Sequence, residues 1–278
     1  MAKIKNTMSD RHIVQKNFNT LLEDYRADIL PSIIQDWDKL SASEQEHMSS
    51  LNNFFCGMHV LVRMADATSS TLVQWENTHF DAPVGASASV VTASKSEAGI
   101  VRLVRTTCKA MCRHGSEQAG VFQPFTAFLR SNEIGKNPLA PFRGNRFNIL
   151  FYDAGVVYYL ASLISKFLTD VWQTPNKLLR AVLADVQVPE FLAGCKALGL
   201  INKIVTGPLW RVIESKDVSI LDMNIHYCHL LECFEKWSKD ASEVVSGEAA
   251  LFRDFPPCLL YTSPSPRDAT LSRMPSSA

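Results

Sequence analysis

The sequence predicts a mainly α-helical fold, a multi-helix array with little or no β structure. Apolar residues recur at three- and four-residue steps over most of the chain, which is the spacing that gathers side chains on one face of a helix. Prolines and glycines separate these segments, and no stretch sustains the alternation typical of a strand. At most, a short strand is expected near Val90 or near Phe147.

Residues 1–81 are expected to form an N-terminal helical segment. Its first helix covers Ile13 to Trp37, where Pro31 is expected to kink the helix or split it in two. Its second helix runs from about Ser43 to Ala67 and follows a Ser-x-x-Glu capping box that begins at Ser41.

A flexible loop of small residues at 82–94 is the expected internal boundary, and a larger helical domain at 95–255 is expected to follow it. The helix-breaking residues of this domain include Gly207-Pro208, which is expected to end a helix. The helices are predicted at residues 95–113, 121–131, 145–171, 175–185, 188–203 and 217–243.

Ser, Pro, Thr and Arg dominate residues 256–278, and this tail is expected to be disordered because its prolines prevent a continuing helix. From about Cys258 the tail also resembles an adapter-derived translation that recurs at the ends of unrelated proteins assembled from transcript reads. The resemblance implies that these last residues are not native and that the native C-terminus is missing.

Charge and cysteine usage limit the classes of function. The 28 Lys and Arg residues balance 28 Asp and Glu residues, so no overall field attracts nucleic acid, and any such contact must be local. Seven cysteines in apolar surroundings suit reduced thiols and a nuclear or cytoplasmic location. No apolar run approaches the ~20 residues that span a bilayer, so no membrane partner is expected.

The most specific local motif is the pair Cys56 and His59, within NNFFCGMHVLVRMAD. A three-residue step places the thiol and the imidazole on one face of a helix, where they can share a contact. Two interpretations remain open. The pair is either functional, or a small buried cysteine beside an ordinary hydrogen-bonded histidine.

Together with the long helical region and the element Arg146-Phe147-Asn148, this motif resembles the hAT transposases and related DDE superfamilies. In those families a Cys-x-x-His pair follows the second catalytic aspartate, and a helical insertion interrupts an RNase H-like core before the final acid. By this resemblance Asp10 stands at the second catalytic aspartate. Arg146 and Asn148 stand in an element usually written Arg-Trp-Asn or Arg-Trp-Ser, in which Phe147 replaces the Trp.

The resemblance also implies a metal-dependent mechanism that this chain does not complete. DDE enzymes use three carboxylates to hold two Mg²⁺ or Mn²⁺ ions at the scissile phosphate. Asp10 is the one catalytic and metal-binding carboxylate that we assign, and the first acid is expected upstream of Met1. The remaining late candidates, Glu232, Glu235 and Glu248, suit solvated helix faces better. We therefore predict a fragment that is inactive alone and holds no cofactor.

Two groups of cysteines and histidines could bind a softer metal. Neither group shows the paired Cys-x₂₋₄-Cys spacing of structural zinc sites, so ordinary helix packing is favoured for both. The groups are Cys108, Cys112 and His114, and His226, Cys228, His229 and Cys233.

Residues 94–146 carry a local excess of basic residues, nine against three acids. Lys and Arg side chains can neutralise DNA phosphates without reading bases, although a solvated helical surface explains the same pattern. The residues that we expect to contact DNA are Arg102, Arg105, Lys109, Arg113, Arg143 and Arg146.

The favoured function is therefore a fragment of a transposon-encoded DNA transposase with a local basic surface for contact with the DNA backbone. The alternative is a domesticated helical module for protein–protein interaction, without DNA chemistry. Association of copies into a homo-oligomer is a further expectation, because apolar helices without covering strands promote association.

Overall fold

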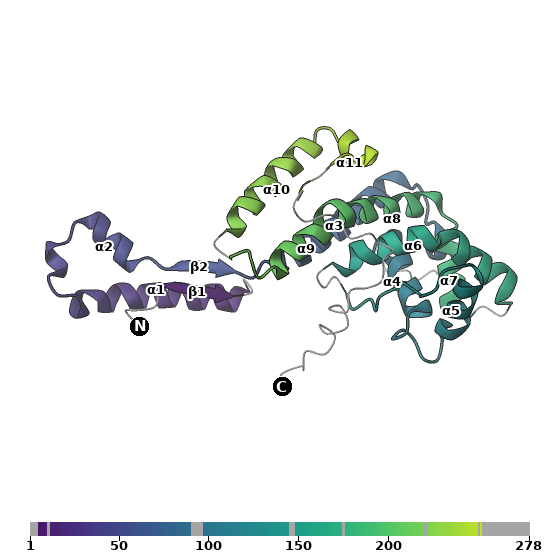
Figure 1. The fold of residues 1–278 in the computed structure, drawn as a ribbon, viewed down its shortest axis with the longest axis horizontal. Coiled ribbons are helices and arrows are strands. Elements are labelled where there is room, and N and C mark those ends of the chain that lie inside the picture. Colours follow the sequence, from purple (N-terminus) through teal and green to yellow (C-terminus); the bar gives the residue numbers. More distant parts are fainter. Residues whose placement is uncertain are drawn as a thin grey trace. The chain divides into compact units, whose positions relative to one another are not determined.

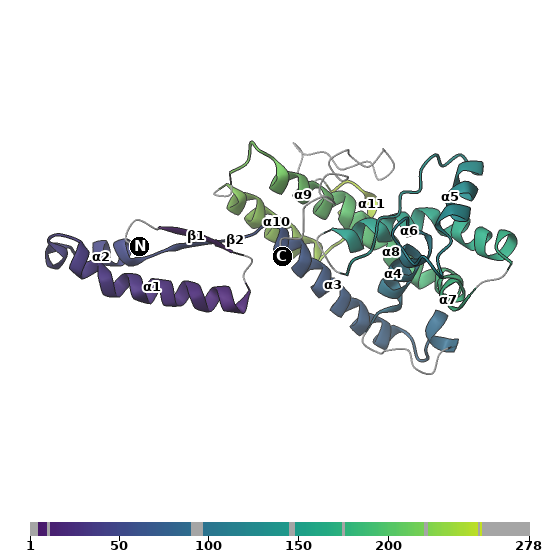
Figure 2. The same ribbon diagram turned by 90° about the horizontal axis from the view of Figure 1, so that it is seen from below.

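A computed structural model of the chain describes residues 5–9, 12–89, 97–144, 148–173, 176–219, 222–249 and 251. The described part is mainly helical and contains one two-stranded parallel sheet, which confirms the predicted fold class (Figures 1 and 2). The chain divides into two compact units, Met1–Val60 and Leu61–Ala278, called unit 1 and unit 2 below. This division lies at a different place from the predicted boundary at 82–94. The predicted tail and the two residues named for a short strand, Val90 and Phe147, lie outside the described residues.

Unit 1 is a β-α-β arrangement. Strand β1 (Asn6–Ser9) pairs in parallel with β2 (Asn52–Phe55), with Ser9 opposite Phe55. Parallel strands need a long crossover between them. The crossover contains helix α1 (Ile13–Ile33), the 3₁₀ turn η1 (Trp37–Lys39) and helix α2 (Ala42–Ser49).

The prediction of one helix from Ser43 to Ala67 is wrong. The capping box does form, and the N–H of Ser41 donates to Oε2 of Glu44 at 2.8 Å, but α2 ends at Ser49. The N–H of Asn52 then donates to the carbonyl of Lys5 at 2.9 Å. Pairing with a strand 46 residues away in sequence decides this segment, and local spacing carries no information about that pairing.

Helix α1 buries a largely polar face. Pro31 does not split the helix, because it lies in the last turn, where an interruption costs few hydrogen bonds. The buried residues of α1 are Asn19, Arg26 and Leu30. Arg26 donates from Nε and from a terminal nitrogen to the carbonyl of Met48, at 3.2 and 3.0 Å, and so ties α1 to α2.

Unit 2 packs its helices around α6 and α8, which have the most extensive contact, while α4 packs against α6, α7 and α8. Most predicted helices of this unit agree with the structure to within a few residues. The elements are α3 (Met58–His79, from Leu61 onward), η2 (Gly85–Ser89), α4 (Gly99–Met111), α5 (Phe122–Ser131), α6 (Ile149–Lys166), η3 (Phe167–Val171), α7 (Lys177–Val186), α8 (Pro189–Ile201), η4 (Asn202–Thr206), α9 (Gly207–Glu214), α10 (Met223–Trp237) and α11 (Ser242–Ser246).

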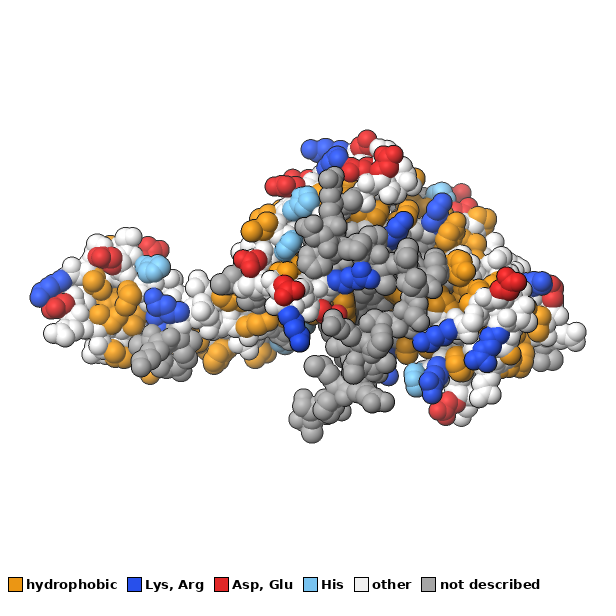
Figure 3. Space-filling view, in the orientation of Figure 1, with side chains coloured by type: hydrophobic (Ala, Val, Ile, Leu, Met, Phe, Trp, Pro, Cys, Tyr) orange, Lys and Arg blue, Asp and Glu red, His pale blue; other side chains and the backbone are white. Residues whose placement is uncertain are grey.

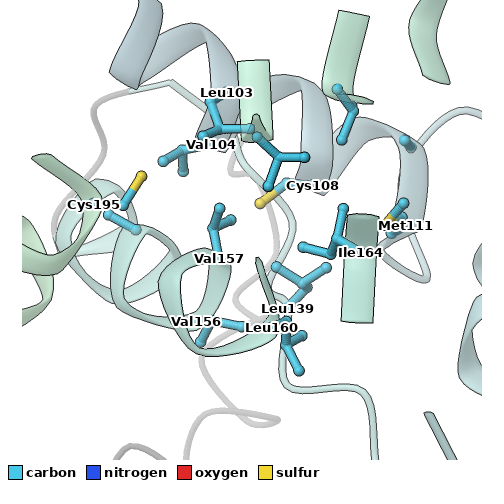
Figure 4. Close-up of a cluster of buried hydrophobic side chains, with 14 of the residues drawn as sticks. Leu103, Val104, Cys108, Met111, Leu139, Val156, Val157, Leu160, Ile164 and Cys195 are labelled. Carbon is cyan, nitrogen blue, oxygen red and sulfur yellow. The ribbon is translucent and has the colours of Figure 1, made fainter. Parts of the chain in front are cut away.

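Apolar side chains from α4, α6 and α8 form the core of unit 2 (Figure 4). Helices α6 and α8 cross closely at two glycines. A Cβ atom at Gly199 would lie only 2.7 Å from the Cα atom of Gly155, so this approach requires glycine. The residues labelled in the figure are Leu103, Val104, Cys108, Met111, Leu139, Val156, Val157, Leu160, Ile164 and Cys195.

The predicted helix end at Gly207-Pro208 is also wrong. The chain stays helical from α8 into α9 because η4 is a π-helical turn, in which the N–H of Gly207 donates to the carbonyl of Asn202 five residues earlier. A π turn changes the hydrogen-bond pattern just before Pro208, which has no N–H to donate. A Cβ atom at Gly207 would lie 2.7 Å from that carbonyl oxygen, so the glycine permits the turn.

A buried ion pair joins three segments of unit 2. Arg102 of α4 donates from Nε to Oδ2 of Asp185 and from a terminal nitrogen to Oδ1, both at 2.8 Å. Asp185 lies at the end of α7 and is fully buried. Its Oδ1 also accepts the N–H of Ala86 in η2 at 2.7 Å, so part of the predicted flexible loop is fixed to α7. Gly85 permits this approach, because its φ is +62° and a Cβ atom would lie 2.3 Å from Oδ1.

A second buried carboxyl group, Asp153 of α6, binds the segment that precedes this helix, residues 137–142. The N–H of Ala140 donates to Oδ1 of Asp153 at 2.9 Å, and the hydroxyl of Tyr152 donates to the carbonyl of Pro138 at 3.0 Å. Oδ2 of Asp153 is buried without a hydrogen-bond partner in the described part of the chain. Burial raises the pKa of Asp153 to about 7, although the N–H of Ala140 and the nearby thiol of Cys108 oppose the rise.

Residues Ile149–Val171, which form α6 and η3, are long and apolar enough to cross a membrane by length and composition, with a mean hydropathy of 1.2. The sequence alone indicated no run of that length. In the structure half of the most apolar 18-residue stretch of this segment is buried, and α6 packs against α8 in the centre of unit 2.

Removing Arg102 is expected to destabilise unit 2 strongly. Arg102→Ala leaves the carboxylate of Asp185 buried without its ion-pair partner, which typically costs about 3–5 kcal/mol of the free energy of unfolding. Arg105→Ala is the matched control, because its pair with Glu97 is partly exposed and is expected to contribute less than about 1 kcal/mol. Urea denaturation followed by circular dichroism measures both. Equal losses in the two variants would contradict the structural role of the buried pair.

Asp153 is expected to make stability fall as pH rises. Below its ordinary pKa of 3.8 both the folded and the unfolded chain keep the proton; between that value and about 7 only the folded chain keeps it. The free energy of unfolding should therefore decrease across this window, by on the order of 4 kcal/mol, and level off above it. Asp153→Asn should remove this contribution, as measured by urea denaturation at several pH values. An unchanged pH dependence in the variant would contradict the assignment.

Candidate functional site

The carboxyl ends of the two strands meet at one edge of the sheet in unit 1. The N–H of Cys56 donates to the carbonyl of Ser9 at 2.8 Å, so the residue that follows β2 is bonded to the last residue of β1. Asp10 is the next residue in the sequence after Ser9, and its placement lies outside the described residues. Functional groups of open parallel sheets collect at such carboxyl edges. We therefore treat this edge as the candidate site of unit 1.

Cys56 and His59 lie at this edge, and both side chains are half-buried. The N–H of His59 donates to the carbonyl of Cys56 at 3.1 Å in the turn that begins α3. Nδ1 of His59 is buried, and within the described residues it has no hydrogen-bond partner. The motif therefore spans the junction of β2 and α3. The sequence had instead predicted that both residues lie on one face of a single helix.

The described residues at this edge do not fit a Mg²⁺ or Mn²⁺ site. Mg²⁺ prefers oxygen ligands in octahedral geometry, whereas Cys56 and His59 offer sulfur and nitrogen. Among the described residues, no group of three or more His, Cys, Asp or Glu side chains is arranged to hold a metal ion. No catalytic step through a metal follows from these residues.

Three cysteines of unit 2 pack as apolar side chains, whereas Cys228 is exposed and Cys233 is half-buried. Cys108, Cys112 and Cys195 are buried, whereas His114 is exposed in the turn after α4. Burial raises the pKa of the Cys108 thiol well above its usual value, and the neighbouring Asp153 raises it further. A protonated buried thiol is a poor metal ligand and a poor nucleophile.

Asn148 anchors the start of α6. Its Nδ2 donates to Oδ1 of Asn202 in η4 at 2.7 Å, and the hydroxyl of Thr206 lies 3.5 Å from the same oxygen. Asn148 therefore links the ends of two core helices. Arg146, the other residue predicted from this element, lies outside the described residues.

Two arginines expected to contact DNA are bound to carboxylates of this chain. Arg102 holds Asp185 as described, and its guanidinium carbon lies 5.9 Å from the centre of the Phe191 ring. Burial opposes the charge on Arg102, but the hydrogen bond with Asp185 and the nearby carboxylate charges together outweigh burial and raise the pKa of Arg102. Arg105 donates to both carboxylate oxygens of Glu97 at 2.6 and 2.7 Å, which raises the pKa of Arg105. The guanidinium groups of both arginines are therefore already bound to carboxylates within the protein.

Exposed bases outnumber exposed acids among the described residues between 106 and 186. This region contains eight exposed bases and three exposed acids, whereas Asp153 and Asp185 are buried. The bases are Lys109, Arg113, Arg130, Lys136, Arg143, Lys166, Lys177 and Arg180, and the acids are Glu117, Glu133 and Asp170.

Lys109 and Arg113, together with Lys177 and Arg180, are called the basic surface below. Helix α7 packs against α4, and Nδ2 of Asn176 donates to the carbonyl of Ala119 in the turn that follows α4, at 2.9 Å. Figure 3 shows Lys and Arg side chains gathered on the part of unit 2 where α4, α5 and α7 lie. Lys177 and Arg180 were not among the residues predicted from the sequence. Their three-residue spacing is visible in the sequence, but the contact between α4 and α7 is not.

Comparison of the chain with protein-family models, with curated protein sequences and with solved structures finds no match in any of the three.

Proposed function

We propose that the chain is part of a transposase-like protein with an RNase H-like core, that it contacts the phosphate backbone of DNA, and that it does not cleave DNA by itself. The carboxyl edge of unit 1 carries this proposal. There a strand followed in sequence by Asp10 lies parallel to a strand followed by Cys56 and His59, and helices continue beyond. The order agrees with the order that the resemblance to hAT transposases implies.

The contact with DNA is assigned to the basic surface and to Arg143. Lys109 lies in the last turn of α4 and Arg113 lies in the turn that follows this helix. Lys177 and Arg180 are three residues apart on α7 and so share one side of that helix. All four are exposed, and none is among the ion-paired residues of the described chain. Exposed bases of this kind neutralise phosphates and position a duplex without reading its sequence.

The chain is expected to show no nuclease activity. A nucleotidyl-transfer site of the DDE type needs a trio of carboxylates, of which this sequence supplies Asp10. Purified protein should leave branched and linear DNA intact in Mg²⁺ or Mn²⁺, as assayed by denaturing gel electrophoresis. Metal-dependent cleavage that Asp10→Ala abolishes would overturn this part of the proposal.

Duplex DNA is expected to bind with strong salt dependence. Lys109→Ala with Arg113→Ala, or Lys177→Ala with Arg180→Ala, should each reduce the slope of log affinity against log salt by about 2, because each phosphate contact contributes about 0.9. Fluorescence anisotropy with a labelled duplex at several salt concentrations measures the slope. Arg143→Ala should lower it by about 1.

Lys203→Ala with Lys239→Ala is the matched control, because both lysines are exposed on unit 2 outside the basic surface. This control should leave both affinity and slope unchanged. The proposal fails if the unaltered chain shows no salt-sensitive binding. A control variant that weakens binding as much as the basic-surface variants would show that charge alone, and not this surface, determines binding.

A further inference from the structure

The segment that joins α5 to α6 is bonded to the buried carboxyl group of Asp153. Its residues 137–142, called the strap below, form neither helix nor strand and include Pro138 and Pro141. Leu139 is buried, whereas the other residues of the strap are half-buried. The strap is therefore an irregular surface segment with one residue inserted into the core of unit 2.

Helix α4 holds the strap in addition to the two bonds from α6. Nδ2 of Asn137 donates to the carbonyl of Met111 at 2.8 Å. The thiol of Cys112 lies 3.5 Å from the carbonyl of Leu139, so the strap covers this cysteine. Side-chain bonds of this kind exchange readily with water, and a segment that they hold opens at lower free energy than a core helix.

Glycines flank the strap on both sides. Gly135 precedes it and Gly144 follows it, and a Cβ atom at either position would meet no atom of the described residues within 4 Å. Gly144 also has a φ of +75°, a left-handed conformation that glycine adopts without strain. The backbone therefore has room to turn at both ends of the strap, as hinge residues do.

Ionisation of Asp153 is unfavourable while the strap is closed. Oδ1 accepts the N–H of Ala140, and Oδ2 has no hydrogen-bond partner among the described residues. None of the ion pairs in the described part of the chain includes Asp153. A buried carboxylate needs a cation or several donors, whereas the neutral acid avoids this cost. Water supplies the missing donors once the strap moves away.

Three buried thiols and one phenol are the ionisable neighbours of the carboxyl group beneath the strap, among the residues that the structure describes. Burial raises the pKa of the Cys108 and Cys112 thiols of α4, and it raises the pKa of Cys195 on α8 to about 12. Tyr152 donates its hydroxyl to the strap. His114, in the turn after α4, is exposed to solvent.

We propose that the strap is a pH-sensitive lid, which opens locally as Asp153 gives up its proton and thereby uncovers Asp153 and Cys112. Opening releases one proton at pH values between the ordinary pKa of Asp153, 3.8, and its pKa in the closed form, about 7. Below this range both forms keep the proton, and above it neither form does. The population of the open form therefore rises about tenfold for each pH unit in this range and levels off above it. This proposal does not depend on the proposed contact with DNA.

Hydrogen exchange at the backbone N–H of Ala140 tests the proposal, because this N–H is bonded to Asp153. Its protection is the exchange rate of an unfolded peptide divided by the observed rate at the same pH. In the full chain this protection should fall about tenfold for each pH unit between about pH 4.5 and 7. It should also stay at least about tenfold below the protection of Val157, a buried residue of α6, because the strap opens while the core stays folded.

Two results with the unaltered chain would overturn the proposal. A protection of Ala140 that does not change with pH would show that the strap does not respond to Asp153. A protection equal to that of Val157 would show that the strap opens only when the whole of unit 2 unfolds.

Asp153→Asn removes the titrating group and keeps the hydrogen bond, because the amide oxygen of asparagine still accepts the N–H of Ala140. In this variant the protection of Ala140 should be independent of pH over the same range. An unchanged pH dependence would assign the effect to another group, such as His114, and the proposal would be wrong.

Asn137→Ala loosens the strap without altering Asp153. Loss of the bond to Met111 should lower the protection of Ala140 by about two- to tenfold at every pH, the usual effect of one hydrogen bond, and should leave its pH dependence unchanged. Asn132→Ala is the matched control, because its Nδ2 donates to the carbonyl of Phe128 at 2.8 Å, outside the strap. An equal loss of protection in the control would contradict the strap as the unit that opens.

Discussion

The bidentate ion pair between Arg102 and Asp185 is the constraint on which the described arrangement of unit 2 depends. It joins α4 to the end of α7, and the same carboxylate holds the backbone of η2. A buried carboxylate is tolerated only when its oxygens are fully paired, and here both oxygens accept from the guanidinium while one also accepts from Ala86. Gly85 then follows as a consequence, because a Cβ atom there would lie 2.3 Å from Oδ1 of Asp185.

This constraint also decides which bases face the solvent. Sequence position places Arg102 and Arg105 among the local excess of basic residues, but folding commits both to carboxylates of the chain. The pair with Asp185 brings α7 against α4, and Lys177 and Arg180 of α7 join Lys109 and Arg113 on the basic surface as a result. The buried pair of Arg102 and Asp185 and the basic surface thus both result from the packing of α7 against α4.

Unit 1 follows a different rule, because polar contacts determine which side of α1 faces inward. Arg26 donates to the carbonyl of Met48 in α2, and Glu23 accepts from Asn53 in β2. The exposed apolar side chains of α1 consequently face away from these contacts. A two-stranded parallel sheet with one covering helix buries little apolar surface, since parallel sheets are normally covered on both faces. The carboxyl edge and the exposed face of α1 therefore lie on a unit whose apolar surface is only partly covered.

The sequence by itself determined the helical class, most helices of unit 2 and the capping box at Ser41, because these depend on spacing and on contacts within a few residues. It also marked Cys56 and His59, and it marked the apolar side chains of α1 without showing that they are exposed. Only the tertiary structure decided that Asn52–Phe55 is a strand, that the chain stays helical through Pro208, and that Arg102 lies inside. Each of these depends on a partner distant in sequence or on a change of hydrogen-bond register, and neither is encoded in local periodicity.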